Sequence, residues 1–240
     1  MLPGKAPQTH GAPEYAMTRR LGPLVFVLAC GLLATSLPAR ALGPLDVELG
    51  AYWWQNDVDA QGIEEDDGAA PAAWARLWFG KWGVRGGYAK GDADPWEMEL
   101  VHVDVVRKIV APTEQNYLAL GIGWGRISIG PGGDGADLDG VRLVADARAN
   151  VAGIVFVYGE AAWSPWLGDP DGERGTFWYG EDAKGYEYEL GVELKIFPST
   201  RLRAGYRLSR VEYDAVPRSG NPVGITQETS GFLAGVSFKF

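Results

Sequence analysis

The sequence predicts an all-β fold: a closed, antiparallel, up-and-down transmembrane barrel of about ten strands, with eight strands as the alternative. From Tyr186 to Ile196, apolar residues alternate without a break with charged residues and glycine, which is the two-residue period of a strand. About ten comparable segments follow residue 41, and none contains an apolar run long enough for a membrane helix. A sheet without covering helices protects its edges by closing on itself.

The first 41 residues have the pattern of a leader that is cleaved after Ala41. Arg19 and Arg20 precede an apolar run over residues 21–37, and small residues follow it, as in a secretory signal. We expect Met17 to be the true start, because the residues before it fit no part of such a signal. Residues 42–240 are then one barrel domain.

Cys30 provides an alternative interpretation of the leader. Val27-Leu28-Ala29-Cys30 resembles a lipobox, which would make Cys30 an acylated first residue, but the apolar run continues beyond it. A retained membrane helix is the other alternative, although the run is only about 17 residues long, the lower limit for a bilayer. Cys30 is the only cysteine, so the predicted mature domain has no disulfide or thiol chemistry.

The predicted mature domain is acidic. Outside the leader, which holds four basic residues and one acidic residue, the chain carries 18 basic and 30 acidic residues, a net charge of −12. Nucleic acid is therefore excluded as an expected partner.

The predicted strands are joined by connections that alternate in length. Short connections are expected at 80–81, 109–115, 150–152 and 198–200, and long polar ones at 57–71, 126–140, 164–184 and 213–228. Only 91–95 is short where a long loop is expected. Short periplasmic turns and long external loops are typical of membrane barrels. The ten predicted strands are 45–56, 72–79, 82–90, 96–107, 116–125, 141–150, 153–163, 185–197, 201–212 and 229–240.

Aromatic residues support the membrane assignment over its alternative, a soluble lipocalin-like barrel in which the rings would pack in a core. The last strand places Phe232, Phe238 and Phe240 on one face and ends on an aromatic residue, like the terminal strand that the barrel-assembly machinery recognises. Several tryptophans lie near predicted strand ends, where interfacial girdles form. These are Trp53, Trp54, Trp74, Trp82, Trp96, Trp124 and Trp163.

The last 90 or so residues resemble the YfaZ family of outer-membrane proteins. The resemblance rests on Tyr158-Gly159-Glu160, Ser164-Pro165, the strand from Tyr186 to Ile196, the segment from Leu202 to Arg207, and the phenylalanine-ended last strand. It implies an outer-membrane barrel without an established activity, so it supplies no catalytic residues.

Charged residues on the face opposite the apolar one are expected to line the lumen. Glu187, Glu189 and Glu193 can pair across a hairpin with Arg201, Arg203 and Arg207. Such pairs would fill a ten-stranded barrel, although rings of charge also form ion-selective passages. The predicted lumen-lining residues are Arg76, Arg85, Arg148, Glu160, Glu187, Glu189, Glu193, Lys195, Arg201, Arg203 and Arg207.

Other candidates for chemistry are weak. His102 is the only histidine outside the leader, and it shares a strand face with Asp104, but no serine partner can be nominated. We therefore expect no enzyme activity and no cofactor. Asp134 and Asp137 lie in a single glycine-rich repeat, with Asp139 close by, that resembles a calcium motif needing tandem copies. An external turn is therefore expected and no metal site, with a weak divalent site on these three residues as the alternative.

Together these features predict a protein exported to the outer membrane of a Gram-negative bacterium. Its expected partners are outer-membrane lipids, lipopolysaccharide and the barrel-assembly machinery. A structural or surface-interaction role is the first prediction. A narrow charge-lined channel is the second, and an envelope hydrolase the third.

Overall fold

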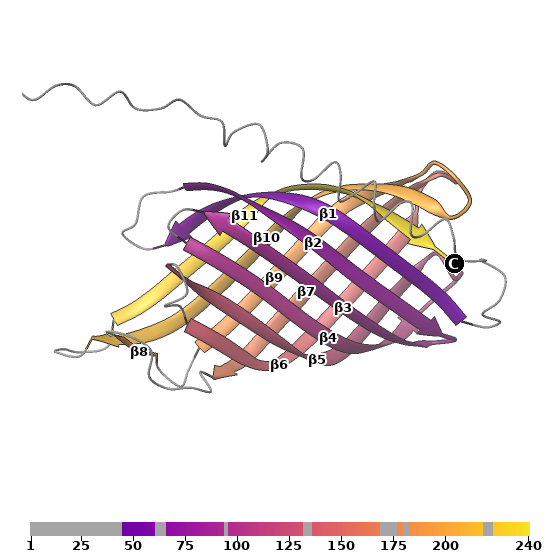
Figure 1. The fold of residues 1–240 in the computed structure, drawn as a ribbon. Coiled ribbons are helices and arrows are strands. Elements are labelled where there is room, and N and C mark those ends of the chain that lie inside the picture. The colour runs from indigo at the N-terminus through magenta and orange to yellow at the C-terminus, as the bar shows by residue number, and fades with distance from the viewer. Residues whose placement is uncertain are drawn as a thin grey trace, which may run out of the picture.

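The computed structural model describes residues 45–60, 66–93, 96–131, 136–168, 177–179, 183–217 and 223–240 (Figure 1). The predicted leader lies outside these residues. Ten long strands form the barrel, and one short strand is added at its edge. The long strands are β1 (Leu45–Ala60), β2 (Asp66–Phe79), β3 (Trp82–Ala93), β4 (Trp96–Val110), β5 (Tyr117–Pro131), β6 (Ala136–Asn150), β7 (Val155–Gly168), β9 (Ala183–Lys195), β10 (Thr200–Pro217) and β11 (Val223–Lys239).

Every long strand pairs with its neighbours in an antiparallel manner, and β11 pairs with both β10 and β1. The sheet therefore closes on itself, which confirms the up-and-down barrel and its ten strands and rules out eight. The short strand β8 (Phe177–Tyr179) pairs with the far end of β10 and was not predicted from the sequence. Among the described residues, no helix is long and apolar enough to cross a membrane.

The two ends of the barrel differ. The turn end carries four connections, two of which contain glycines in the left-handed region, Gly80 with φ 59° and Gly153 with φ 68°. The carboxyl terminus also lies there, because Val47 and Phe240 exchange backbone hydrogen bonds of 3.4 and 2.8 Å. The opposite end, the loop end, carries the other connections and β8 (Figure 1). The predicted alternation of short and long connections is wrong, because the strands extend into the expected long loops: six residues separate β4 from β5 at the turn end, but only five separate β1 from β2 and two separate β3 from β4 at the loop end.

The strands run further toward the loop end than the sequence predicted. In their additional residues the polarity of the two faces is inverted, with apolar side chains inside and polar side chains outside. In the turn half of β10, Leu202 and Tyr206 are exposed on the outside and Arg203 is buried inside. Beyond this point Val211 is buried inside, and Glu212 lies on the outer face. A strand segment with a polar outer face resembles a loop when a single apolar face is sought, which explains the shorter prediction.

The inversion divides the barrel into two levels. The loop half encloses an apolar core that includes Trp54, Leu138, Leu167 and Val211, as in a water-soluble barrel. The turn half carries an apolar belt outside, which matches the outer surface of membrane barrels. From Tyr188 to Ile196, the outward residues of β9 and of the position after it are apolar and exposed, and these nine residues correspond to a rise of roughly 20 Å at a tilt of about 45°. The exposed belt includes Leu77, Val84, Val103, Val105, Leu120, Ile122, Leu143, Leu190, Val192 and Leu202.

The aromatic residues are divided between the belt and the interior. Trp82, Trp124 and Trp163 are exposed on the outer face, as an interfacial girdle requires. Trp54 and Trp74 point inward instead and pack in the apolar core, so the prediction that they belong to the girdle is wrong. The physical reason is that alternate residues of a strand face opposite sides of the sheet, and both tryptophans occupy inward positions, Trp54 in β1 and Trp74 in β2.

The phenylalanines of the last strand share the outer face but have different surroundings. Phe232 is the most exposed of them and meets Tyr206 edge-on, with ring centroids 5.4 Å apart. Phe238 is buried with Val236, and Phe240 packs against this pair. The aromatic row therefore runs along β11 to the turn end.

Candidate functional site

The interior of the turn half is filled by a network of buried charges. In the part of the chain that the structure describes, seven arginines and seven carboxylates meet there, so their formal charges balance. We call this set the interior network. Its members are Arg76, Arg85, Arg142, Arg148, Arg201, Arg203, Arg207, Glu48, Asp104, Asp146, Glu160, Glu187, Glu189 and Glu193.

Near the turn end, the network is centred on Glu48 of β1. The Nη1 and Nη2 atoms of Arg148 each donate to one of its carboxylate oxygens at 3.0 Å, a bidentate pair. Arg201 donates to the same carboxylate at 2.8 Å. The second Arg148 contact is Glu193, which is fully buried and lies 2.9 Å away. Two carboxylates and two arginines thus join four strands across the lumen.

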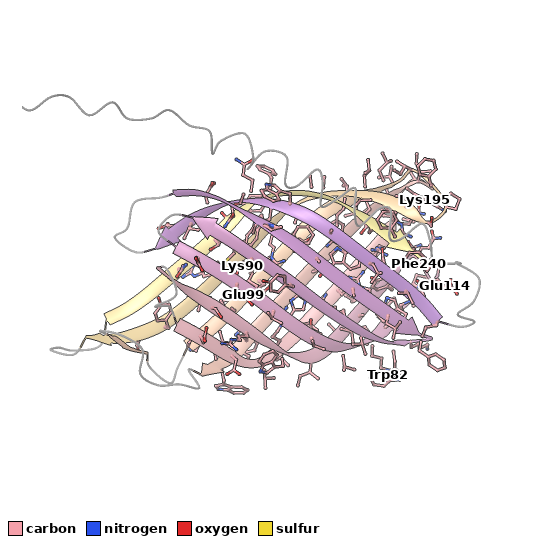
Figure 2. All side chains as sticks on the ribbon, viewed as in Figure 1. Trp82, Lys90, Glu99, Glu114, Lys195 and Phe240 are labelled. Atoms are coloured by element: carbon pink, nitrogen blue, oxygen red, sulfur yellow. The ribbon has the colours of Figure 1, made fainter. Side chains whose placement is uncertain are left out.

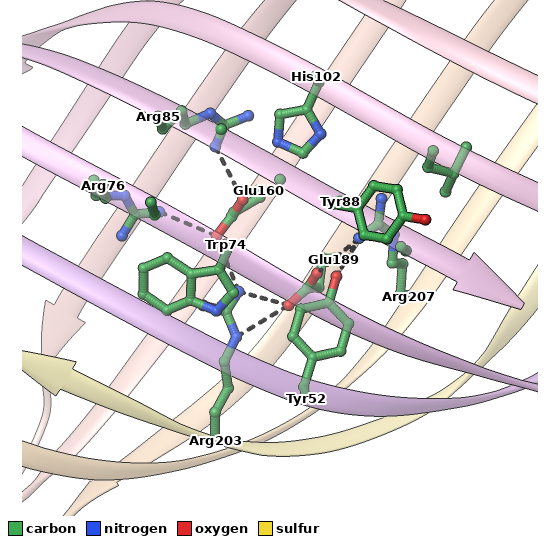
Figure 3. Close-up of a pocket in the computed structure, with 15 residues that line it drawn as sticks. Tyr52, Trp74, Arg76, Arg85, Tyr88, His102, Glu160, Glu189, Arg203 and Arg207 are labelled. Atoms are coloured by element: carbon green, nitrogen blue, oxygen red, sulfur yellow. Dashed lines mark hydrogen bonds and ion pairs between the residues drawn. The ribbon is translucent and has the colours of Figure 1, made fainter. Parts of the chain in front are cut away.

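The middle of the network is organised by Glu160 of β7 (Figure 3). This carboxylate accepts hydrogen bonds from Arg85 and Arg203 at 2.9 Å and from Arg76 at 3.1 Å. Arg203 also donates to Glu189. Because these arginines come from β2, β3 and β10, Glu160 links opposite walls of the barrel.

Towards the loop end, Glu187 accepts hydrogen bonds from both Arg142 and Arg207. Arg207 also donates to the hydroxyl of Tyr52 on β1. Asp104 accepts from Nε of Arg85 at 2.9 Å. The network therefore continues without interruption to the level where the apolar core begins.

The predicted hairpin pairs form, but diagonally. The backbone register places Arg203 opposite Glu193 and Arg207 opposite Glu189. The shortest ion pairs instead join Arg203 to Glu189, and Arg207 to Glu187 at 2.7 Å. Strand tilt makes such diagonal contacts accessible to long side chains.

Tyr158 of β7 packs over two glycines of the hairpin, Gly191 and Gly205. A Cβ atom at Gly191 or Gly205 would lie 2.5 or 2.6 Å from the Tyr158 hydroxyl oxygen, so only glycine fits beneath the ring. The guanidinium of Arg203 stacks over the ring, 3.8 Å from its centroid. This aromatic side chain thus fixes the position of the central arginine.

The predicted lumen-lining residues lie inside the barrel, and ten of the eleven belong to the interior network. The exception is Lys195, which lies half-buried at the turn end of β9 and forms no ion pair with the described residues. The sequence analysis missed four members. Glu48, Arg142 and Asp146 lie an even number of positions from other inward residues of their strands, so the two-residue period could have identified them. Asp104 had been noted only beside His102.

The interior leaves little free space. Two cavities of about 30 Å³ each lie beside His102, Glu160 and Arg207, and this volume holds about two water molecules. On the turn side, a second apolar cluster includes Trp78, Val106 and Tyr117. The network is therefore enclosed between apolar side chains at both levels, an arrangement suited to a structural plug.

The remaining candidates are not gathered into one site. His102 lies beside the network, but its side chain makes no hydrogen bond with the described residues, and the adjacent Asp104 is engaged by Arg85 and Arg142. Asp137 forms an ion pair with Arg126, while Asp134 lies outside the described residues. No group of three potential metal ligands occurs among the residues that are described.

Comparisons with known proteins give similarities of fold only. No family model matches the chain, and no curated protein matches it. The outer membrane protease OmpT from Escherichia coli is similar with a TM-score of 0.49 and 12% identity, covering 85% of this chain and all of its own. Neisserial surface protein A has a TM-score of 0.42 and 14% identity, covering 82% of this chain and 98% of its own.

Proposed function

We propose that this protein is an integral barrel of the Gram-negative outer membrane with a structural or surface-interaction role and no enzymatic activity. The observation that carries the proposal is the combination of an apolar outer belt with a charge-balanced, filled interior. The belt needs lipid around it, whereas the side chains of the described residues leave little room for solutes inside. Membership of the YfaZ family is part of this proposal, and it is supported by the sequence resemblance.

In the proposed orientation, the turn end faces the periplasm and the loop half stands above the membrane. Outer-face charges such as Asp57, Glu97 and Glu212 support this, because they lie above the belt. The loop half would then meet lipopolysaccharide and the outside medium. The phenylalanines of β11 would be read by the barrel-assembly machinery during insertion.

Folding in lipid tests the proposal. The predicted mature domain, refolded from denaturant into phospholipid vesicles, is expected to show a heat-dependent shift in gel mobility and to stay with the vesicles after alkaline washing. The same domain diluted into buffer without lipid is expected to aggregate. A folded, monomeric and soluble product without lipid or detergent would contradict the proposal.

A narrow channel is the second candidate, and the two charged cavities favour it. They share Arg85, His102, Glu160, Glu189 and Arg207 among their lining residues, so they lie side by side along the interior. Breaking the central pair by Arg203→Gln or Glu189→Gln would test whether these cavities form part of a passage. A stepwise current already present in the wild type, with an ion selectivity changed by either substitution, would support the channel.

A further inference from the structure

An aromatic and basic patch lies on the outer face at the turn end. Trp82 begins β3 and is 57% exposed, and the neighbouring Phe79 is 64% exposed. Arg107 of β4 lies directly opposite Trp82 in the sheet register, and its guanidinium stacks on the indole 5.4 Å from the ring centroid. The amide of the next residue, Lys108, donates to the carbonyl of Lys81 at 2.8 Å, which holds the turn beside Arg107.

The two outward cations of this patch are available to a ligand. Lys81 and Arg107 are exposed, and neither forms an ion pair with a carboxylate of the described residues. Stacking occupies the face of the Arg107 guanidinium and leaves its edge N–H groups free to donate. A planar donor fork beside an ammonium group suits a phosphate.

The charges of the barrel surface are also segregated. Outside the interior network and the buried Lys108, the side chains described at the turn end comprise four basic and two acidic ones, namely Lys81, Arg107, Lys195 and Lys239 against Asp46 and Glu114. Above the belt the outer face is mainly acidic and includes Glu99, although Lys90 lies beside it (Figure 2). An anionic ligand is therefore favoured at the turn end.

We propose that Lys81, Trp82 and Arg107 form a site for the headgroup phosphate of an anionic phospholipid in the periplasmic leaflet. The patch continues the apolar belt, since Leu77, Val84 and Val105 are exposed in the next outward row on its membrane side and would contact the acyl chains. The site rests on the proposed membrane function, because it requires the turn end to lie at a lipid headgroup layer. A phospholipid fits better than a soluble anion, which would gain nothing from the apolar neighbours.

Lipid retention measures this site directly. The refolded barrel in detergent is mixed with equal amounts of phosphatidylglycerol and phosphatidylcholine, and the bound lipids are counted by native mass spectrometry. Since each basic residue near a membrane contributes substantially to anionic lipid binding, we expect about a tenfold preference for phosphatidylglycerol. The preference is expected to fall towards one in the double variant Lys81→Gln with Arg107→Gln.

The matched control removes the same charge elsewhere. Lys90→Gln with Lys184→Gln neutralises two exposed cations of the loop half and is expected to keep the preference. Equal retention of both lipids by the wild type would overturn the site even if the double variant failed to fold. The site would also be overturned if the control variant lost the preference for phosphatidylglycerol as completely as the Lys81/Arg107 double variant. A barrel that folds in vesicles but shows no preference contradicts this site alone, whereas one that does not fold there contradicts the proposed function.

Discussion

Replacing Glu48 by glutamine is expected to destabilise the barrel by about 3–5 kcal/mol, the typical cost of breaking a buried ion pair by removing one partner. The carboxylate is 2% exposed and lies 3.0 Å from Arg148, 2.8 Å from Arg201 and 3.7 Å from Arg76. Glutamine keeps the size and one acceptor oxygen but removes the charge. Three buried guanidinium groups would then share one negative charge fewer.

Urea unfolding in lipid vesicles, followed by tryptophan fluorescence, measures this loss. Adding Arg201→Gln to the Glu48 variant restores the charge balance, so the double variant is expected to be more stable than the sum of the single effects by about 1–3 kcal/mol. Glu114→Gln, in the exposed turn after β4, is the control and should change the free energy of unfolding by less than about 0.5 kcal/mol. A Glu48 variant as stable as this control would refute the reasoning.

Two further substitutions test the packing of the interior and the level of the membrane. Gly191→Val is expected to cost about 1–3 kcal/mol by displacing the Tyr158 ring. Gly159→Ala should be nearly neutral in the same unfolding assay, because an added Cβ would make ordinary contacts, with the Leu190 side chain at 3.6 Å and a backbone oxygen at 3.9 Å. Equal effects would contradict the proposed packing. Val103→Lys places a charge on the belt and is expected to reduce vesicle-bound stability by about 2–4 kcal/mol, while Glu99→Lys above the belt should cost less than about 1 kcal/mol. The reverse order would mean that the membrane level is misplaced.

The alternating segments of the sequence predicted the strands and the inward residues of the turn half of the barrel. From Tyr186 to Ile196 one face is apolar and the other is charged or glycine, so strand type and inward residues followed directly from the two-residue period. The strand number was predicted by counting about ten such segments, and closure was predicted because no helices cover the edges of the sheet. These features are local, which is why they could be read without a structure.

The loop half could not be predicted in the same way. There Trp54 faces inward and Asp57 outward, the reverse of the polarity that a lipid-facing strand requires. A single membrane-barrel pattern therefore ended the strands too early and assigned inward tryptophans to the girdle. The short strand β8 depends on pairing with the distant end of β10, which no local pattern encodes.

The interior network shows a similar division between local and distant information. Strand parity identified Arg203 and Glu189 as inward residues, but their partners depend on which strands face each other across the lumen. The bond between Glu48 and Arg148 joins residues 100 positions apart. Its existence follows from barrel closure and register, and a sequence pattern specifies neither of them residue by residue.

Single-channel recording tests the central claim, that this is a membrane barrel sealed by a neutral network of buried charges. The folded wild type, inserted in a planar bilayer and verified by its heat-dependent gel shift, is expected to give no stepwise current at moderate voltage. The Glu48→Gln variant, in which the network loses its charge balance, is expected to give transient openings. Stable stepwise currents from the wild type would contradict the account and establish a conducting passage in its place.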